Sequence, residues 1–349
     1  MMLTCAICVS LVGALAAGNL KTQEPAKSVI LLTMPKLDWA LEVGGTELIV
    51  EKKEIAADGK SARFMAADWT SGILISGFLE DEGRPATPEQ CRDSYFTRLK
   101  DTPPKEEDIV QSKLGDMAVV EYIVKEFTGI KIDQKHMNAY LTKGNFWMDV
   151  HLSKMSFKEG QRDAFNGILR NIKLIPKTPA QKTQASYRVT DQMVLRLDIP
   201  AGWSDEIKPG SGKTPPEIRM TPPPGSSSLV LTTVLSFQRD MPDTERLTGI
   251  RRTVEDAGKE ALPQAVEKAY DIRQFQGQSS IGYLFTLTDK APKPNEFKYM
   301  TQGGYGVGRL VLLFTVLSNE KDSEVLKQTL AMVGNAQAVT DRPRKASTP

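Results

Sequence analysis

The feature that most constrains the fold is an internal duplication. The segment "YLTKGNF" (Tyr140–Phe146) matches "YMTQGGY" (Tyr299–Tyr305), with Tyr, Thr and Gly at the same spacing. The surroundings of both copies also match in order, because each half of the sequence indicates strands, a helix, further strands and a final helix. Internal repetition of this kind indicates two copies of one structural unit rather than a single large domain.

The first helix of each copy has a clear start signal. Thr87 is predicted as an N-cap, and Gln90 completes a capping box in "ATPEQCRDSYFTRLK". The second copy is "PDTERLTGIRRTVEDAGKEAL", with Asp243 as the expected cap. Aligning the caps places Cys91 opposite Leu247 on the apolar stripe. We therefore expect Cys91 to be a core residue rather than a nucleophile.

Strand signals precede and follow these helices. Runs of β-branched and aromatic residues alternate with Gly, Asn and Lys, which predicts antiparallel strands joined by short turns. Apolar residues at helical spacing then predict a closing helix in each copy. These residues are Phe165, Ile168, Leu169 and Ile172 in the first copy, and Val325, Leu326, Leu330 and Val333 in the second. The predicted fold class is α+β: two tandem units, each a mostly antiparallel sheet flanked by helices.

These signals give the expected domain boundaries. The first unit covers 29–175 and the second 187–338, joined by a linker over 176–186 that is rich in Pro, Lys, Gln and Thr. Residues 339–349 are expected to be a disordered tail.

The N-terminal segment, 1–17, is predicted to be a signal peptide. Residues 1–19 carry no charge, and Ala14-Leu15-Ala16 has the small-x-small pattern that signal peptidase accepts. An uncleaved anchor is the alternative, and it is the only route to membrane association that the sequence offers. The expected location is therefore periplasmic or extracellular. Cys5 and Cys8 lie inside this segment, where a redox role is not expected.

One further segment points to a known family. The strand start "LDIPAGW" (Leu197–Trp203), followed by a hairpin, a helix, three strands and a closing helix, resembles the PsbP / DcrB / Mog-type α/β/α sandwich superfamily. The first copy has Trp39 in "KLDWALEV" instead of the Pro-x-Gly-Trp pattern. The resemblance implies two tandem sandwich units of a non-catalytic, often exported kind, which bind other proteins or lie beside membrane complexes.

Two glycine-rich segments resemble phosphate-binding loops without meeting the requirements. In Gly210–Thr214, "GSGKT", the first glycine of a P-loop is replaced by Ile207, polar residues precede the segment, and prolines follow it. We expect Lys213 to be exposed at a hairpin tip, as in the "DGKS" of 58–61. "GGYGVGR" (303–309) precedes a β-rich run, so a hairpin is expected there instead of a dinucleotide site.

No catalytic, cofactor-binding or metal-binding residues are predicted. The two histidines, His136 and His151, occur in no recognised ligand or triad spacing. The chain has 45 basic and 43 acidic residues, and this balance gives no expectation of a nucleic-acid partner. We therefore expect no cofactor and no enzymatic activity.

The remaining candidates are aromatic residues near expected turns. They form either a contact surface for a protein partner or part of the core and its edges: Trp69, Phe146, Trp147 and Tyr305. The leading hypothesis is an exported, non-enzymatic binding or accessory protein of the cell envelope that acts through protein–protein contacts. The alternative is a small-molecule or lipid-binding protein, or a weak hydrolase, with a groove between or within the units.

Overall fold

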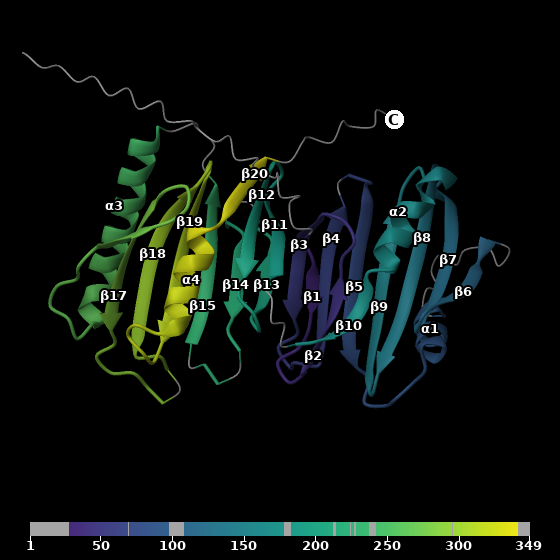
Figure 1. Cartoon of the computed structure of the whole chain (residues 1–349), viewed down its shortest axis with the longest axis horizontal. Coiled ribbons are helices and arrows are strands. Elements are labelled where there is room, and N and C mark those ends of the chain that lie inside the picture. The colour runs from purple at the N-terminus through teal and green to yellow at the C-terminus, as the bar shows by residue number, and fades with distance from the viewer. Residues whose placement is uncertain are drawn as a thin grey trace, which may run out of the picture.

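The computed structural model describes residues 28–340, except 69, 98–107, 178–182, 212–213, 224, 227, 237–241 and 295. The fold is α+β, with antiparallel sheets and four α-helices in the described residues. The same order of strands and helices occurs twice along the chain (Figure 1).

The first half forms one large and one small sheet. Its elements, in chain order, are β1 (Ile30–Leu32), β2 (Trp39–Val43), β3 (Leu48–Ile55), β4 (Ser61–Asp68), β5 (Ile73–Asp81), α1 (Pro88–Phe96), β6 (Val110–Leu114), β7 (Met117–Phe127), β8 (Ile130–Lys143), β9 (Phe146–Lys154), α2 (Arg162–Leu169) and β10 (Ile172–Pro176). The large antiparallel sheet has the order β3-β4-β5-β9-β8-β7-β6. The small sheet has the order β1-β2-β10.

The second half repeats this arrangement. Its elements are β11 (Thr183–Thr190), β12 (Met193–Ile199), β13 (Ser204–Lys208), β14 (Glu217–Thr221), β15 (Ser228–Ser236), α3 (Asp243–Ala261), β16 (Arg273–Gln276), β17 (Ile281–Thr288), β18 (Tyr299–Val307), β19 (Leu310–Ser318), α4 (Glu324–Gly334) and β20 (Gln337–Thr340). The large sheet has the order β13-β14-β15-β19-β18-β17-β16, and β11-β12-β20 pair beside it.

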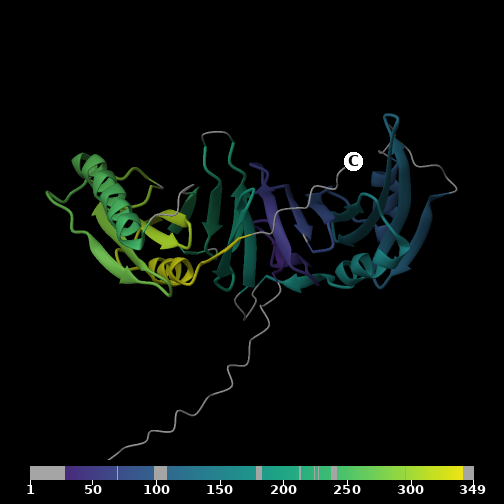
Figure 2. The same ribbon diagram turned by 90° about the horizontal axis from the view of Figure 1, so that it is seen from above.

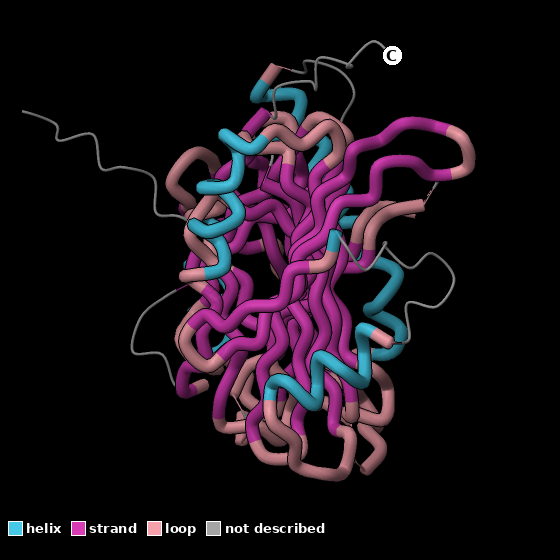
Figure 3. Tube along the Cα trace, turned by 90° about the vertical axis from the view of Figure 1, so that its right-hand side faces the viewer, coloured by secondary structure: helices cyan, strands magenta, loops and turns pink. Residues whose placement is uncertain are grey.

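The two helices of each half lie on opposite faces of its large sheet. Along β7, Ala118 and Val120 pack in one cluster with Cys91 of α1, whereas Met117 and Val119 pack in another with Phe165 of α2. This alternation is the two-residue period of a strand that is buried on both sides. In the second half, α3 and α4 are separated in the same way. Figures 2 and 3 show the strands as a central layer with helices on either side.

The two large sheets meet at the centre of the molecule. Ile207 of β13 pairs antiparallel with Lys53 of β3, and Tyr187 of β11 pairs parallel with Val50. The ammonium group of Lys53 lies 2.7 Å from a carboxylate oxygen of Asp205, and the Tyr187 hydroxyl donates to the other oxygen at 2.8 Å. All three polar side chains are buried and have a partner, as buried charges require. The joint is therefore part of the core, and Figure 1 shows β3 beside β13.

The duplicated motif identified the correct hairpins but the wrong register. The turn joins Lys143 to Phe146 in β8–β9, and Val307 to Leu310 in β18–β19. Gly144 therefore corresponds to Gly308, and both glycines have positive φ. The sequence match instead paired Gly144 with Gly303, five residues earlier (308 against 303). Packing determines which residue types occur along a strand, so similar residues can occur in both halves at positions that do not correspond in the strand register.

Helix starts were predicted well, with one correction. The capping box of Thr87 and Gln90 is confirmed at α1, and Cys91 is fully buried in the core. In the second half, Pro242 is the N-cap and Asp243 is already the first helical residue. The Asp243 carboxylate accepts from Arg246 instead of capping the helix.

The expected boundaries between the units need correction too. Strand β11 begins at Thr183, inside the expected linker of 176–186, and β20 extends to Thr340, inside the expected tail of 339–349. Both strands pair with β12, which explains why polar residues adopt an extended conformation there. The predicted signal peptide, 1–17, lies outside the described residues. Among the described helices, none combines the length and apolar character that crossing a bilayer requires.

Candidate functional site

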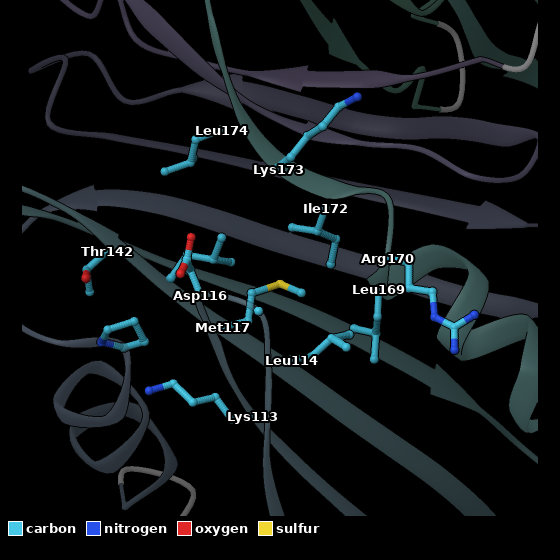
Figure 4. A pocket seen from close by; sticks show the side chains of 13 residues that line it. Lys113, Leu114, Asp116, Met117, Thr142, Leu169, Arg170, Ile172, Lys173 and Leu174 are labelled. Atoms are coloured by element: carbon cyan, nitrogen blue, oxygen red, sulfur yellow. The ribbon is translucent and has the colours of Figure 1, made fainter.

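A pocket of about 730 Å³ opens at the side of the first half (Figure 4). Its volume lies in the range typical of small-molecule sites. It is bounded by the β6–β7 turn, strand β8, the end of α2, and β10. Six apolar side chains form its floor: Leu114, Met117, Leu141, Leu169, Ile172 and Leu174. Polar side chains stand around them: Lys113, Asp116, Thr142, Arg170 and Lys173.

Local sequence features explain why this place is open. Gly115 has a positive φ in a two-residue turn. Leu114 and Met117 therefore pair directly beside this turn, which ends the β6–β7 hairpin. Helix α2 ends at Leu169, with Arg170 as its C-cap, and the chain turns straight into β10. The short turn and the short helix leave a hollow over Met117 of β7 and Leu141 of β8, which are each 6% exposed.

The charges around the pocket differ in their pairing. The ammonium group of Lys113 lies 2.8 Å from Glu89, and that of Lys173 lies 3.0 Å from Glu42. The hydrogen bond from Lys113 holds the pKa of Glu89 at about 2, and Glu89 in turn raises the pKa of Lys113. Arg170 is exposed, and its guanidinium has no ion-pair partner within the described part of the chain. Arg170 is thus the cation available to a ligand.

The corresponding place in the second half is filled. Leu141 pairs with Met148 in the first half, and Tyr305 takes the same position opposite Leu312 in the second. Tyr305 is fully buried, and its ring packs on Phe275 with 5.6 Å between ring centroids. The larger aromatic side chain occupies the space that stays open beside Leu141.

Hydrogen bonds of the Tyr305 hydroxyl also hold the surrounding loop and helix end together in the second half. The Tyr305 hydroxyl accepts from the backbone N–H groups of Ser279 (3.2 Å) and Ser280 (3.1 Å), and it donates to the Gly334 carbonyl at 3.3 Å. The N–H of Gln278 also donates to the Gly334 carbonyl, at 2.7 Å. The β16–β17 loop is therefore fastened to the end of α4. No such fastening joins the Gly115 turn to the end of α2 in the described residues.

The aromatic residues predicted as a contact surface are not gathered on one. Trp147 is only 2% exposed, and its indole N–H donates to the Arg84 carbonyl. Tyr305 is buried in the other half, as described above. Phe146 is half-buried against Trp39, with 5.7 Å between ring centroids. Trp69 lies outside the described residues. Core and edge packing, the interpretation that the sequence favoured for these residues, describes Trp147, Tyr305 and Phe146.

The structure brings together two histidines that sequence reasoning left apart. His136 Nδ1 and His151 Nε2 lie 2.8 Å from each other, and the His136 ring stacks on Tyr122. The register of β8 and β9 places Asn138 opposite His151, so His136 is its diagonal neighbour. Burial lowers the pKa of each histidine to about 4. Fifteen residues separate them in sequence, and only the strand register reveals the contact.

A buried carboxyl group lies on the same face of the sheet. Asp149 accepts from the amide nitrogen of Asn138 at 3.0 and 3.1 Å, and burial raises the pKa of Asp149 to about 7. The amide oxygen of Asn138 is buried without a partner in the described residues. These side chains hydrogen-bond with one another, His136 with His151 and Asn138 with Asp149.

Metal-binding chemistry has no candidate site in the described structure. No cluster of three or more His, Cys, Asp or Glu side chains suited to hold a metal ion occurs among the residues that the structure describes.

The "GSGKT" segment lies between two antiparallel strands, β13 and β14. Backbone hydrogen bonds join Ser211 and Thr214 across the loop, and the chain continues into β14 instead of a helix. The segment does follow a strand, β13, which the polar sequence did not indicate. Without a following helix, the loop lacks the N-terminal dipole that holds phosphate. Gly212 and Lys213 themselves lie outside the described residues.

Comparisons of the chain with protein-family models, curated proteins and solved structures find no match in any of the three.

Proposed function

We propose that this protein is a non-enzymatic binding protein whose first half takes a small apolar or amphipathic ligand. The observation that carries the proposal is the contrast between corresponding places in the two halves. The pocket beside Leu141 is open, whereas Tyr305 fills the same place in the second half. This contrast favours the small-molecule or lipid-binding alternative over a contact surface of aromatic residues.

The size of the pocket supports a useful affinity. A ligand that buries roughly 300 Å² of apolar surface gains about 7 kcal/mol from leaving water. Loss of translational and rotational freedom offsets part of this gain. Dissociation constants of about 10 µM or weaker are therefore expected for simple ligands.

Three further proposals come from the sequence. We propose that each half is an α/β/α sandwich unit of the PsbP / DcrB / Mog type, supported by helices on opposite faces of each large sheet. The protein is periplasmic or extracellular, supported by the uncharged, apolar segment of residues 1–17. A protein or envelope component is its partner. This is supported by Phe127 (53% exposed) and Ile130 (65% exposed), which face each other at the tip of the β7–β8 hairpin.

A fluorescence titration with the neutral probe N-phenylnaphthylamine tests pocket binding. We expect saturable enhancement with one site in the wild type, and at least about tenfold weaker binding in Leu141→Phe, because the larger ring occupies the floor. Leu174→Phe, at a half-buried position of the pocket floor, is a second filling variant in case Leu141→Phe does not fold. Circular dichroism checks the fold of each variant.

The matched control is Met65→Phe. This position is apolar, 53% exposed and distant from the pocket on β4, so the same ring should leave probe binding unchanged. Absence of saturable binding by the wild type, or full affinity in both folded filling variants, would contradict the proposed function.

A further inference from the structure

We infer that the pocket ligand is an anionic amphiphile, whose charged head is bound by Arg170 and whose apolar chain covers the pocket floor. This inference rests on the proposed function, because it assigns the class of ligand that the same pocket takes.

The basic side chains that line the pocket differ in whether they already have a carboxylate partner. Lys113 and Lys173 already have carboxylate partners, Glu89 and Glu42, which do not line the pocket. Arg170 has none in the described residues and is exposed beside the apolar floor. A guanidinium presents a planar pair of N–H donors that matches a carboxylate, phosphate or sulfate head. The unpaired cation therefore selects an anion.

The floor of the pocket is apolar. The floor side chains, from Leu114 to Leu174, carry no hydrogen-bonding groups, so a ligand covering them must be apolar over most of its length. A nucleotide or sugar would leave its own polar groups without partners on such a floor. A hydrocarbon chain needs none, which leaves a head group at one end as the only polar requirement.

The positions of the charges set the direction of the ligand. Figure 4 shows Asp116 and Arg170 on different sides of the pocket, with Met117 between them in the view. Asp116 is the acidic residue among those lining the pocket, and its carboxylate repels an anion. The head therefore lies at the Arg170 side, next to the end of α2, and the chain extends over Met117 toward Leu174.

Another reason for an arginine at this position is helix stability. A cation next to the last turn of α2 interacts favourably with the helix dipole whether or not a ligand binds. The two roles predict different effects of Arg170→Gln. Loss of a helix contact would weaken binding of every ligand alike, whereas loss of a head-group contact would affect anionic ligands alone.

The test displaces N-phenylnaphthylamine from the full chain with three ligands of equal chain length, each below its micelle concentration. These are dodecanoate, dodecanol and dodecyltrimethylammonium. We expect dodecanoate to bind about tenfold more tightly than dodecanol, and the trimethylammonium compound to bind most weakly. Dodecyl phosphate is tested as a fourth ligand. Whichever of dodecanoate and dodecyl phosphate binds more tightly identifies the preferred head group.

Substitutions test which residue causes the preference for dodecanoate over dodecanol. Arg170→Gln should remove the difference between dodecanoate and dodecanol while leaving the dodecanol affinity unchanged. Lys131→Gln is the matched control, because Lys131 is exposed on β8, pairs with Asp133 and does not line the pocket, so this variant should keep the preference. Asp116→Asn should strengthen dodecanoate binding by about twofold to threefold.

The outcomes separate the two proposals. If dodecanol binds as tightly as dodecanoate, the inference is wrong and the proposed function stands. The inference is equally wrong if Arg170→Gln weakens both ligands alike. If none of the compounds displaces the probe and the probe itself does not bind saturably, the proposed function fails.

Discussion

Two half-buried histidines, His136 and His151, and the buried Asp149 lie on one face of the first sheet, on β8 and β9. Burial lowers the pKa of His136 and His151 to about 4 and raises the pKa of Asp149 to about 7. In each case burial disfavours the charged form, so it favours the neutral imidazole of the histidines and the protonated carboxyl group of Asp149. The two types therefore change stability in opposite senses as the pH changes.

This opposition predicts a pH dependence. Between about pH 4 and 6.5, the unfolded chain holds one proton more than the folded chain at each histidine, and one proton fewer at Asp149. The net difference is one proton, so the free energy of unfolding from these groups falls by about 1.4 kcal/mol per unit as the pH decreases. Asp149→Asn removes the opposing contribution, and the slope should increase by a further 1.4 kcal/mol per unit or so.

Urea unfolding of the wild type and Asp149→Asn, in steps between pH 4.5 and 6.5, measures the two slopes. Other titratable groups contribute equally to both proteins, so the difference between the slopes isolates Asp149. Equal slopes would show that Asp149 is ionised in the folded protein at these pH values.

The burial and contacts of some residues could be predicted from the sequence, and those of others could not. The burial of Cys91 followed from its place on a helical stripe, because α-helical spacing fixes which residues share a face. The contact between His136 and His151 did not, since it depends on the register of two strands. The burial of Trp147 and Tyr305 likewise depends on which neighbours cover each face of β9 and β18.

At the level of elements, the β16–β17 hairpin shows how closely the second half is packed. Phe275 crosses over Gly282, the residue opposite it on β17, and a Cβ added at Gly282 would lie 2.0 Å from the Phe275 ring. Phe275 is then in position to pack on Tyr305. The first half has Met117 at the position of Gly282, and Leu114 takes the position of Phe275 opposite it.

Gly282→Ala should therefore destabilise the protein by about 1–3 kcal/mol, because the ring of Phe275 must move from its packed position. The matched control is Gly249→Ala in α3, where an added Cβ meets no atom within 4 Å. That variant should stabilise the protein by about 0.5–1 kcal/mol through helix propensity. Thermal unfolding compares the two variants, and a neutral Gly282→Ala would contradict the packing described for this hairpin.

Elements with strong local signals were predicted, and short paired strands were missed. The cap of α1 and the β-branched runs of β7, β15 and β19 identify those elements from sequence alone. The polar strands β13 and β20 extend only because β14 and β12 pair with them. The pocket was missed for a related reason, since it arises from where α2 ends relative to a turn in a distant hairpin.

At the scale of the whole molecule, the halves share one core through the pairing of β3 with β13. Their meeting point contains a buried ion pair, with side-chain exposures of 5% for Lys53 and 10% for Asp205. Residues of both halves belong to one apolar cluster around it, including Phe64 and Ile218. Because buried charges and apolar contacts both cross the joint, we expect the wild type to unfold in one cooperative transition.

Lys53→Met tests this joint. The substitution leaves the Asp205 carboxylate buried with Tyr187 as its remaining partner, and removal of one member of a buried pair costs about 3–5 kcal/mol. The double variant Lys53→Met with Asp205→Asn removes the unpaired charge as well, so much of the lost stability should return. Differential scanning calorimetry should show a single transition in the wild type, and a lower or divided transition in Lys53→Met. Two separate transitions in the wild type would mean that the halves fold independently, and an unchanged Lys53→Met would mean that the ion pair does not stabilise their contact.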